Sequence, residues 1–109
     1  MNDTLTLGTT GSWTNAGSGT PPLPRSSPRM AFDSNRGVTV LFGGSDVNGH
    51  PSLTAEFSSS GWQAVSPLTL PPGRVTHELV YDSFRGTIVM FGGGNSSGAP
   101  LSDTWEFGP

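Results

Sequence analysis

Short apolar runs separated by glycine, proline and polar residues follow one another along this chain of 109 residues. Residues 38–42 (VTVLF) and 87–91 (TIVMF) are almost continuously apolar, and each run ends in a glycine pair. Strands that are buried on both faces have this pattern, whereas a helix needs apolar positions at a period near 3.6 over a longer stretch. No stretch keeps a helical period, so the pattern predicts an all-β chain.

The two apolar runs belong to a repeat. A shift of 49 residues superposes the two glycine pairs and also relates Trp13 to Trp62. A shift of 50 then relates TAEF (54–57) to TWEF (104–107). Because one register holds along the whole chain, the sequence is that of a repeat protein.

Each unit is expected to form one small sheet of short strands. Gly37 and Gly86 lie in the turn after the first strand, where glycine adopts a positive φ without steric cost. A sheet this small cannot bury both faces alone, and radial stacking of such sheets solves that problem. The expected strands are 29–33, 38–42, 53–57 and 61–65 in the first unit, and 78–82, 87–91 and 103–107 in the second.

Several features occur together in these units. An arginine precedes the first strand, DSNRG or DSFRG forms the hairpin, FGG ends the second strand, and DTWEF is a third strand. With this combination of features, nearly the whole chain resembles the kelch-repeat family, and the motifs are of the bacterial type. The first unit departs from the pattern at Pro28, where the second has His77, and at Ala55, where the second has Trp105.

The resemblance implies a β-propeller in which each unit is one four-stranded blade. Residues 24–66 would form the first kelch blade, and residues 67–109 a second blade that lacks its outer strand. Residues 1–23 resemble a third and a fourth strand. In the kelch family an N-terminal strand commonly completes the C-terminal blade, so this segment is expected to close the ring.

Two blades cannot close a ring and would leave apolar faces bare. The expected partner is therefore the chain itself, associated head to tail through an interface that closes by rotation. Kelch rings usually have six or seven blades, so a homotrimer with six blades is the first expectation. A tetramer with eight blades is the next, and a fragment of a longer propeller is the third interpretation.

Arginine and carboxylate pairs are expected to fix the blades. Asp33 and Asp82 should accept backbone N–H bonds in the turns and pair with Arg36 and Arg85. Glu56 and Glu106 are expected to pair with Arg25 or Arg74 of an adjacent blade. The residues assigned to blade structure and interfaces are Arg25, Asp33, Arg36, Gly43, Gly44, Trp62, Arg74, Asp82, Arg85, Gly92, Gly93, Trp105 and Glu106.

Charge and composition exclude several classes of protein. The net charge is −3, and the only basic side chains besides the two histidines are five scattered arginines, so no basic patch for nucleic acid is expected. The chain has no cysteine, which excludes disulfides, thiolate metal sites and the cysteine-dependent copper-radical cofactor of some kelch-like oxidases. Neither a membrane span nor a signal peptide is recognised. A soluble protein without cofactor is expected, its compartment undetermined.

No constellation of catalytic residues emerges, so we expect a non-catalytic binding scaffold. His77 is a weak metal candidate that is expected to pack or hydrogen-bond between blades, while His50 is expected to be a solvated loop residue. Trp13, Trp62 and Trp105 should pack between blades. The loop residues expected to face a protein or glycan ligand are Asp46, Asn48, His50, Asn95 and Ser97. The alternative is a carbohydrate, metal or enzymatic site at the channel mouth, built around Arg29, His77 and Glu78.

Overall fold

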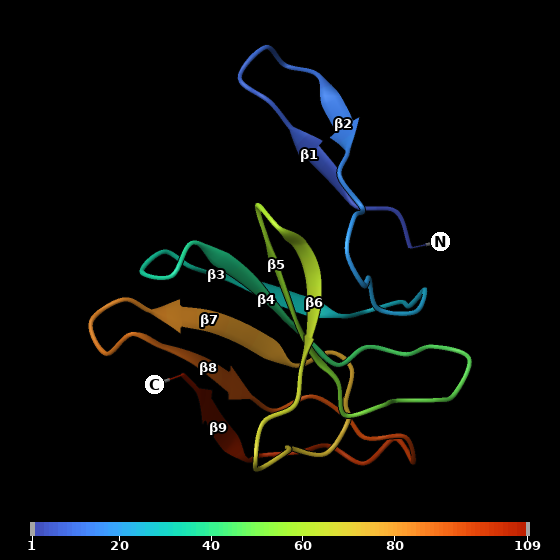
Figure 1. Ribbon diagram of the computed structural model, residues 1–109. Helices are drawn as coiled ribbons and strands as arrows, with labels where there is room; N and C mark the ends of the chain where they lie inside the picture. The colour runs from blue at the N-terminus through green and yellow to red at the C-terminus, as the bar shows by residue number, and fades with distance from the viewer. Residues whose placement is uncertain (1, 109) are drawn as a thin grey trace.

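The computed structural model describes residues 2–108, and this part of the chain contains nine strands and no helix (Figure 1). The all-β prediction is therefore confirmed. Three antiparallel sheets form, which we call the N-terminal hairpin, the central sheet and the C-terminal sheet. They contain, in this order, β1 (Leu5–Leu7) and β2 (Trp13–Asn15); β3 (Arg29–Asp33), β4 (Val38–Phe42), β5 (Thr54–Ser58) and β6 (Gly61–Val65); and β7 (Glu78–Asp82), β8 (Thr87–Phe91) and β9 (Thr104–Phe107).

Glycines set the ends of the strands. Gly37 and Gly86 both have φ of 71° in the turns that follow β3 and β7, and each N–H donates to the carbonyl that ends the preceding strand. The glycine pairs after β4 and β8 also have positive φ. The third strands start at Thr54 and Thr104, one residue later than the repeat predicted.

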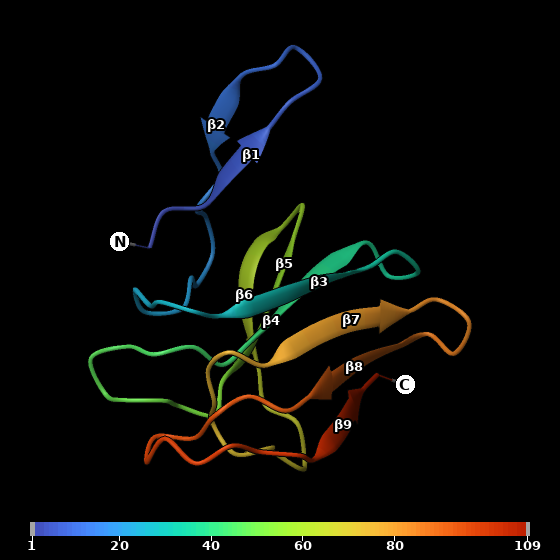
Figure 2. The same cartoon turned by 180° about the vertical axis from the view of Figure 1, so that it is seen from behind.

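The central and C-terminal sheets stack face to face, with β3 beside β7 (Figures 1 and 2). Val40 and Phe42 of β4 are buried on one side of this contact, and Ile88 and Met90 of β8 are buried on the other. Alternation along β4 places Leu41 on the opposite face of the central sheet, where it forms a second small core with Ala55 and Trp62. The central sheet thus has apolar residues on both faces.

The N-terminal hairpin stands apart from both larger sheets, and its strands are exposed along their whole length (Figure 2). Only the segments next to the hairpin are hydrogen-bonded to the central sheet. After β2, Trp62 N donates to Ser18 O at 2.9 Å and Thr20 N donates to Trp62 O at 3.0 Å; before β1, Thr4 Oγ1 accepts from Trp62 Nε1 at 2.7 Å. The interblade packing expected for Trp13 is therefore not found in this chain, because no sheet covers β2.

Within residues 2–108 no helix exists that could cross a membrane.

Candidate self-assembly interface

The contact between the central and C-terminal sheets is closed by apolar side chains. Register places Leu79, Met90 and Trp105 on one face of the C-terminal sheet. Facing them are Val40 and Phe42 of the central sheet. Val40, Phe42, Ile88 and Met90 are between 2% and 4% exposed, so the two sheets bury each other's apolar side chains.

His77 adds a polar contact to this interface. Its side chain is fully buried, its Nε2 lies 2.9 Å from the carbonyl oxygen of Phe42, and its ring meets the Phe42 ring edge-on. Burial lowers the pKa of His77 and outweighs the hydrogen bond to Phe42 O, which acts in the opposite direction. The predicted role in hydrogen bonding between the units agrees with this placement.

Glycine lets the two sheets approach closely. A Cβ on Gly43 would lie 2.6 Å from the carbonyl oxygen of Arg74 and 2.9 Å from the His77 ring. Gly44 N donates to Arg74 O at 3.0 Å. The pair after β4 is thus required by sheet stacking as well as by its backbone conformation.

The two outer faces of the stack are the repeat counterparts of the buried interface. The shift of 49 relates the exposed Val80 and Phe91 to Ala31 and Phe42 of the buried face of the central sheet. It also relates Met30 and Phe32 to residues of the C-terminal sheet that lie on its inner face. Four apolar side chains on the outer faces are between 50% and 60% exposed: Met30 55%, Phe32 56%, Val80 55% and Phe91 52%.

An arginine bridges two carboxylates on the same side of each sheet. Arg36 Nε lies 2.8 Å from Asp33 Oδ2, and its Nη2 lies 2.7 Å from Glu56 Oε2. The predicted aspartate–arginine pairs are thus present, but the expectation that Glu56 and Glu106 pair with Arg25 or Arg74 is wrong. Adjacent strands place Glu56 opposite Val40, within reach of the Arg36 side chain. The second triad is Asp82, Arg85 and Glu106.

The two triads differ in how well they are covered. The Asp33 side chain is 3% exposed and that of Asp82 is 31% exposed. Arg36 also lies over the Phe107 ring of the C-terminal sheet at 5.9 Å. Burial disfavours the charge on Asp33, but hydrogen bonds from Arg36 and Tyr81 outweigh burial and lower its pKa. The second triad has the same geometry and no sheet over it.

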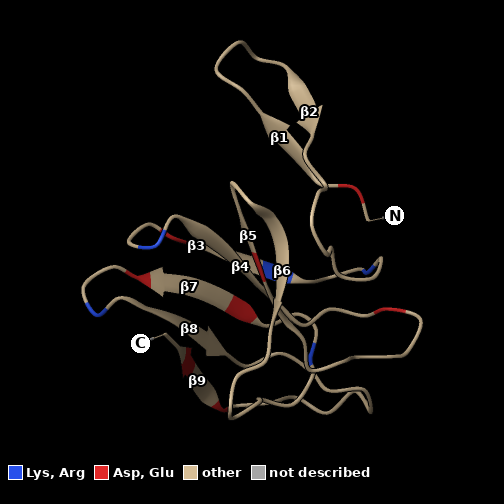
Figure 3. Ribbon diagram, in the orientation of Figure 1, with Lys and Arg blue, Asp and Glu red and all other residues tan. Residues whose placement is uncertain are grey.

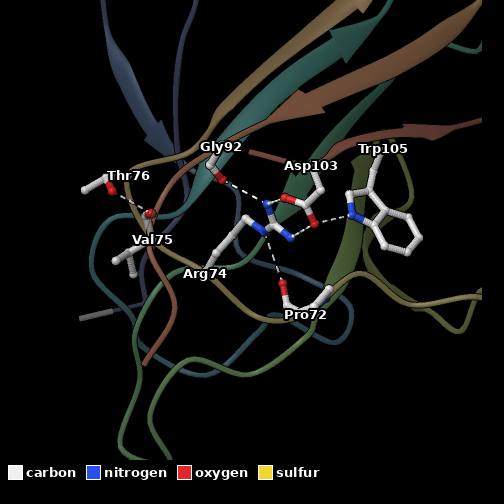
Figure 4. A network of polar contacts seen from close by, with 7 residues as sticks. All are labelled: Pro72, Arg74, Val75, Thr76, Gly92, Asp103 and Trp105. Carbon is white, nitrogen blue, oxygen red and sulfur yellow. Dashed lines mark hydrogen bonds and ion pairs between the residues drawn. The ribbon is translucent and has the colours of Figure 1, made fainter. Parts of the chain in front are cut away.

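Arg25 and Arg74 join loops to the glycine pairs. Arg74 is fully buried; it donates to Gly92 O at 2.9 Å and forms a bidentate pair with Asp103 at 2.6 and 2.8 Å (Figure 4). Trp105 Nε1 donates to the same carboxylate at 2.7 Å. Donation by Arg74, followed by that of Trp105, holds the pKa of Asp103 well below its usual range. The repeat pattern does not single out Asp103, because its counterpart in the first unit is Leu53, which has no charge.

In the first unit the equivalent arginine, Arg25, pairs with a carboxylate at a different position. Arg25 donates to Gly43 O at 3.0 Å and pairs with Asp46 at 3.3 Å, and both side chains are nearly buried. Asp46 therefore anchors the loop, and the expectation that it faces a ligand is wrong. Arg25, Arg36, Arg74 and Arg85 each pair with at least one carboxylate, and Figure 3 marks where the charged residues lie along the ribbon.

The remaining loop residues fall into two groups. Asn48 and Ser97 are exposed at the loop tips, and Asn95 holds its turn by accepting from Ser97 N and Ala99 N, both at 3.0 Å. His50 is half-buried, and its carbonyl oxygen lies against Gly73. The expectation that His50 is a solvated residue is therefore wrong.

Two open features remain at the ends of the stack. An open groove of about 690 Å³ lies between the N-terminal hairpin and the outer face of the central sheet, lined by Thr6, Asn15, Phe32 and Phe57 among others. At the other end, β9 has no strand partner on its outer edge within residues 2–108. Apolar faces and open strand edges of this kind are sites of association.

No cluster of three or more histidine, aspartate or glutamate side chains among the described residues is placed to hold a metal ion. No family model matches the chain, and a search of curated proteins finds no match.

Proposed function

We propose that this protein is a kelch-like propeller unit whose activity is self-assembly. Copies associate head to tail, so that the outer face of the C-terminal sheet in one copy covers the outer face of the central sheet in the next. One observation carries the proposal: both exposed faces are the repeat counterparts of an interface whose apolar side chains are buried inside the chain. The internal contact is thus a template for the contact between copies.

The template also specifies polar contacts between copies. Arg36 lies over Phe107 within the chain, and the repeat counterparts of these residues are Arg85 and Phe57. Arg85 of one copy would therefore lie over Phe57 of the next and bring Asp82 and Glu106 under cover. With two blades from each chain, a trimer gives a six-bladed ring and a tetramer gives an eight-bladed one.

The assembled ring would present binding loops on one edge. The loops at 43–53 and 92–103 leave the stack on the same side, opposite the turns after β3 and β7 (Figures 1 and 2). Hydrogen bonds of Asp46 and Asn95 to backbone N–H groups hold both loops in defined turns. Rigid loops that repeat around a ring offer a multivalent surface for a protein or glycan ligand, and no catalysis is required.

The test is the native mass of the protein as a function of its concentration. Wild-type protein should form one discrete oligomer, a trimer or else a tetramer. Phe91→Asp places a charge at the centre of the proposed contact, where it would be desolvated without a partner, so the oligomer should be lost. Circular dichroism should still report strands, because Phe91 is already half exposed in the single chain.

Val47→Asp is the matched control. Val47 is a 90% exposed valine in the loop after β4, so the same gain of charge there should leave the mass unchanged. A wild-type protein that stays monomeric at high concentration contradicts the proposal, and so does a Phe91→Asp variant that assembles as the wild type does.

A further inference from the structure

We propose that β1 pairs with β2 only in the single chain, and that β9 of another copy takes the place of β1 beside β2 when the chains assemble. This inference rests on the proposed self-assembly and specifies how the open edge of the C-terminal sheet is filled. In the assembled state, β2 of one copy becomes the fourth strand of the neighbour's C-terminal sheet, and β1 is released.

The register of the hairpin supports the exchange. Leu7 is paired with Trp13 in the hairpin, and Phe57 is paired with Trp62 in the central sheet. The same register continues, since Ala16 N donates to Thr4 O at 2.6 Å and Thr54 is paired with Val65. β1 and β2 therefore pair as a third and a fourth strand do, although the first two strands of that sheet are missing.

β9 is the third strand that lacks a fourth. Shifts of 50 and 49 residues carry β5 onto β9 and β6 onto β2. The pairing of β5 with β6 then predicts Phe107 opposite Trp13 and Thr104 opposite Ala16. In the central sheet the corresponding rings, Phe57 and Trp62, are 5.2 Å apart, so Trp13 would gain an aromatic neighbour, which it lacks among residues 2–108 of its own chain.

β9 is held in its sheet far more firmly than β1 is held in the hairpin. Glu106 pairs with Arg85, and the residue before β9, Asp103, pairs with the buried Arg74. In β1 the counterpart of Glu106 is Thr6, which has no charge, and β1 is exposed along its length. The residue before β1, Thr4, accepts one hydrogen bond from Trp62 Nε1 at 2.7 Å and forms no ion pair. When both strands compete for β2 in one assembled sheet, β9 keeps its place and β1 leaves.

The exchange must occur between copies. The hairpin lies beside the central sheet at one end of the stack, and β9 lies at the far end, beyond β7 and β8 (Figures 1 and 2). The described chain measures 43 Å along its longest axis. Within one chain, β2 would have to cross both sheets to reach β9, and it is tied to Trp62 by the segment that ends at Thr20.

The absence of cysteine in the sequence makes a covalent test unambiguous. The variant with Thr4→Cys and Ala16→Cys locks β1 onto β2 when it is oxidised, because paired antiparallel residues have Cα atoms about 5.5 Å apart, a distance that suits a disulfide. The oxidised protein should have the mass of one chain at concentrations where the reduced protein assembles. The reduced sample is its own control.

A second variant detects the new strand pair. Ala16→Cys with Thr104→Cys changes no residue of the ion pairs that hold β9, and its oxidation during assembly should link chains into covalent oligomers on a denaturing gel. The single variants, which lack one thiol of the pair, should give no ladder beyond a dimer.

The outcomes separate this inference from the proposed function. If the locked hairpin assembles like the wild type, or if Ala16→Cys with Thr104→Cys links only within one chain, the exchange is wrong and self-assembly stands. If the wild type itself never assembles, both proposals are overturned.

Discussion

His77 is the residue that makes the internal interface most sensitive to pH. Its side chain is fully buried between the sheets, Nε2 contacts Phe42 O, and Nδ1 is buried without a hydrogen-bond partner among residues 2–108. The first unit has Pro28 at the equivalent position. A single ring that must stay neutral therefore determines how the packing responds to acid.

The pH dependence of stability follows from that burial. The pKa of His77 in the folded chain lies below the ordinary value of 6.5, so the unfolded chain takes up the proton first as the pH falls. The free energy of unfolding should therefore decrease below about pH 6.5, by up to about 1.4 kcal/mol per pH unit, until the folded pKa is reached. Urea denaturation between pH 7.5 and 5 measures this slope.

His77→Gln should remove the slope, since glutamine can still donate to Phe42 O and does not titrate. His50→Gln is the matched control, because it removes the other histidine and leaves His77 in place. An unchanged slope in His77→Gln would show that another group is responsible. The lowered pKa values of Asp33, Asp82 and Asp103 act only at more acid pH, below their ordinary value of 3.8.

At the scale of elements, the repeat predicted where strands lie better than it predicted which side chains meet. Apolar runs closed by glycine pairs are local signals, so β3, β4, β6, β7 and β8 have the predicted bounds. The partner of Glu56 depends instead on how β5 is aligned with β4 and on the reach of Arg36. Such an alignment is a property of the folded sheet.

The arginines show the second limit of reasoning from a repeat. Arg25 and Arg74 are equivalent, yet Arg25 is neutralised by Asp46 and Arg74 by Asp103. The counterpart of Asp46 is Asn95, so the second unit needed a carboxylate from elsewhere. Equivalent arginines thus both pair with a carboxylate, but the carboxylate comes from a different position in each unit.

Glycine positions at the ends of elements give the next prediction. Gly93 has φ of 91°, and a Cβ there would lie 2.6 Å from Val75 O and 2.9 Å from His77 Cβ. Gly98 has a similar φ of 82°, but a Cβ there meets nothing within 4 Å. Gly93→Ala should lower the free energy of unfolding by about 1–3 kcal/mol more than Gly98→Ala does.

The comparison cancels the backbone strain that both alanines share, so the difference measures steric approach alone. Thermal or urea denaturation of the two variants in parallel is sufficient. Equal losses would mean that the chain around Val75 relaxes easily and that the close approach is not needed.

At the scale of the whole molecule, the proposed contact between copies would be a weaker version of the contact inside the chain. Burial raises the pKa of Asp33, and Arg36 together with Tyr81, from across the internal interface, lowers it; His77 contributes a hydrogen bond to Phe42 O. In the proposed assembly the same positions on the central sheet are occupied by Phe32 and Pro28, and neither side chain is a donor. The apolar contact is repeated, and these two polar contacts are not.

Phe32→Tyr should therefore strengthen the assembly. The new hydroxyl would meet Asp82 of the neighbouring copy, and a hydrogen bond to a charged group stabilises a contact by about 1.5–3 kcal/mol. The concentration of half-assembly should fall by roughly tenfold, which dilution followed by mass photometry measures. Phe84→Tyr is the control, because Phe84 is fully exposed in the turn after β7 and should change nothing. Equal effects of both variants would contradict the proposed pairing of faces.

In the proposed assembly the two outer faces are different halves of one contact, and this has a consequence for mixtures of intact and altered chains. A chain with a disruptive substitution on the outer face of its C-terminal sheet keeps an intact outer face on its central sheet. It would therefore still bind one wild-type neighbour, but no further chain could bind to its altered face. Such a chain acts as a terminator. In a mixed population a minority of damaged copies would stop many rings from closing, so the defect would be dominant although the variant alone is simply monomeric.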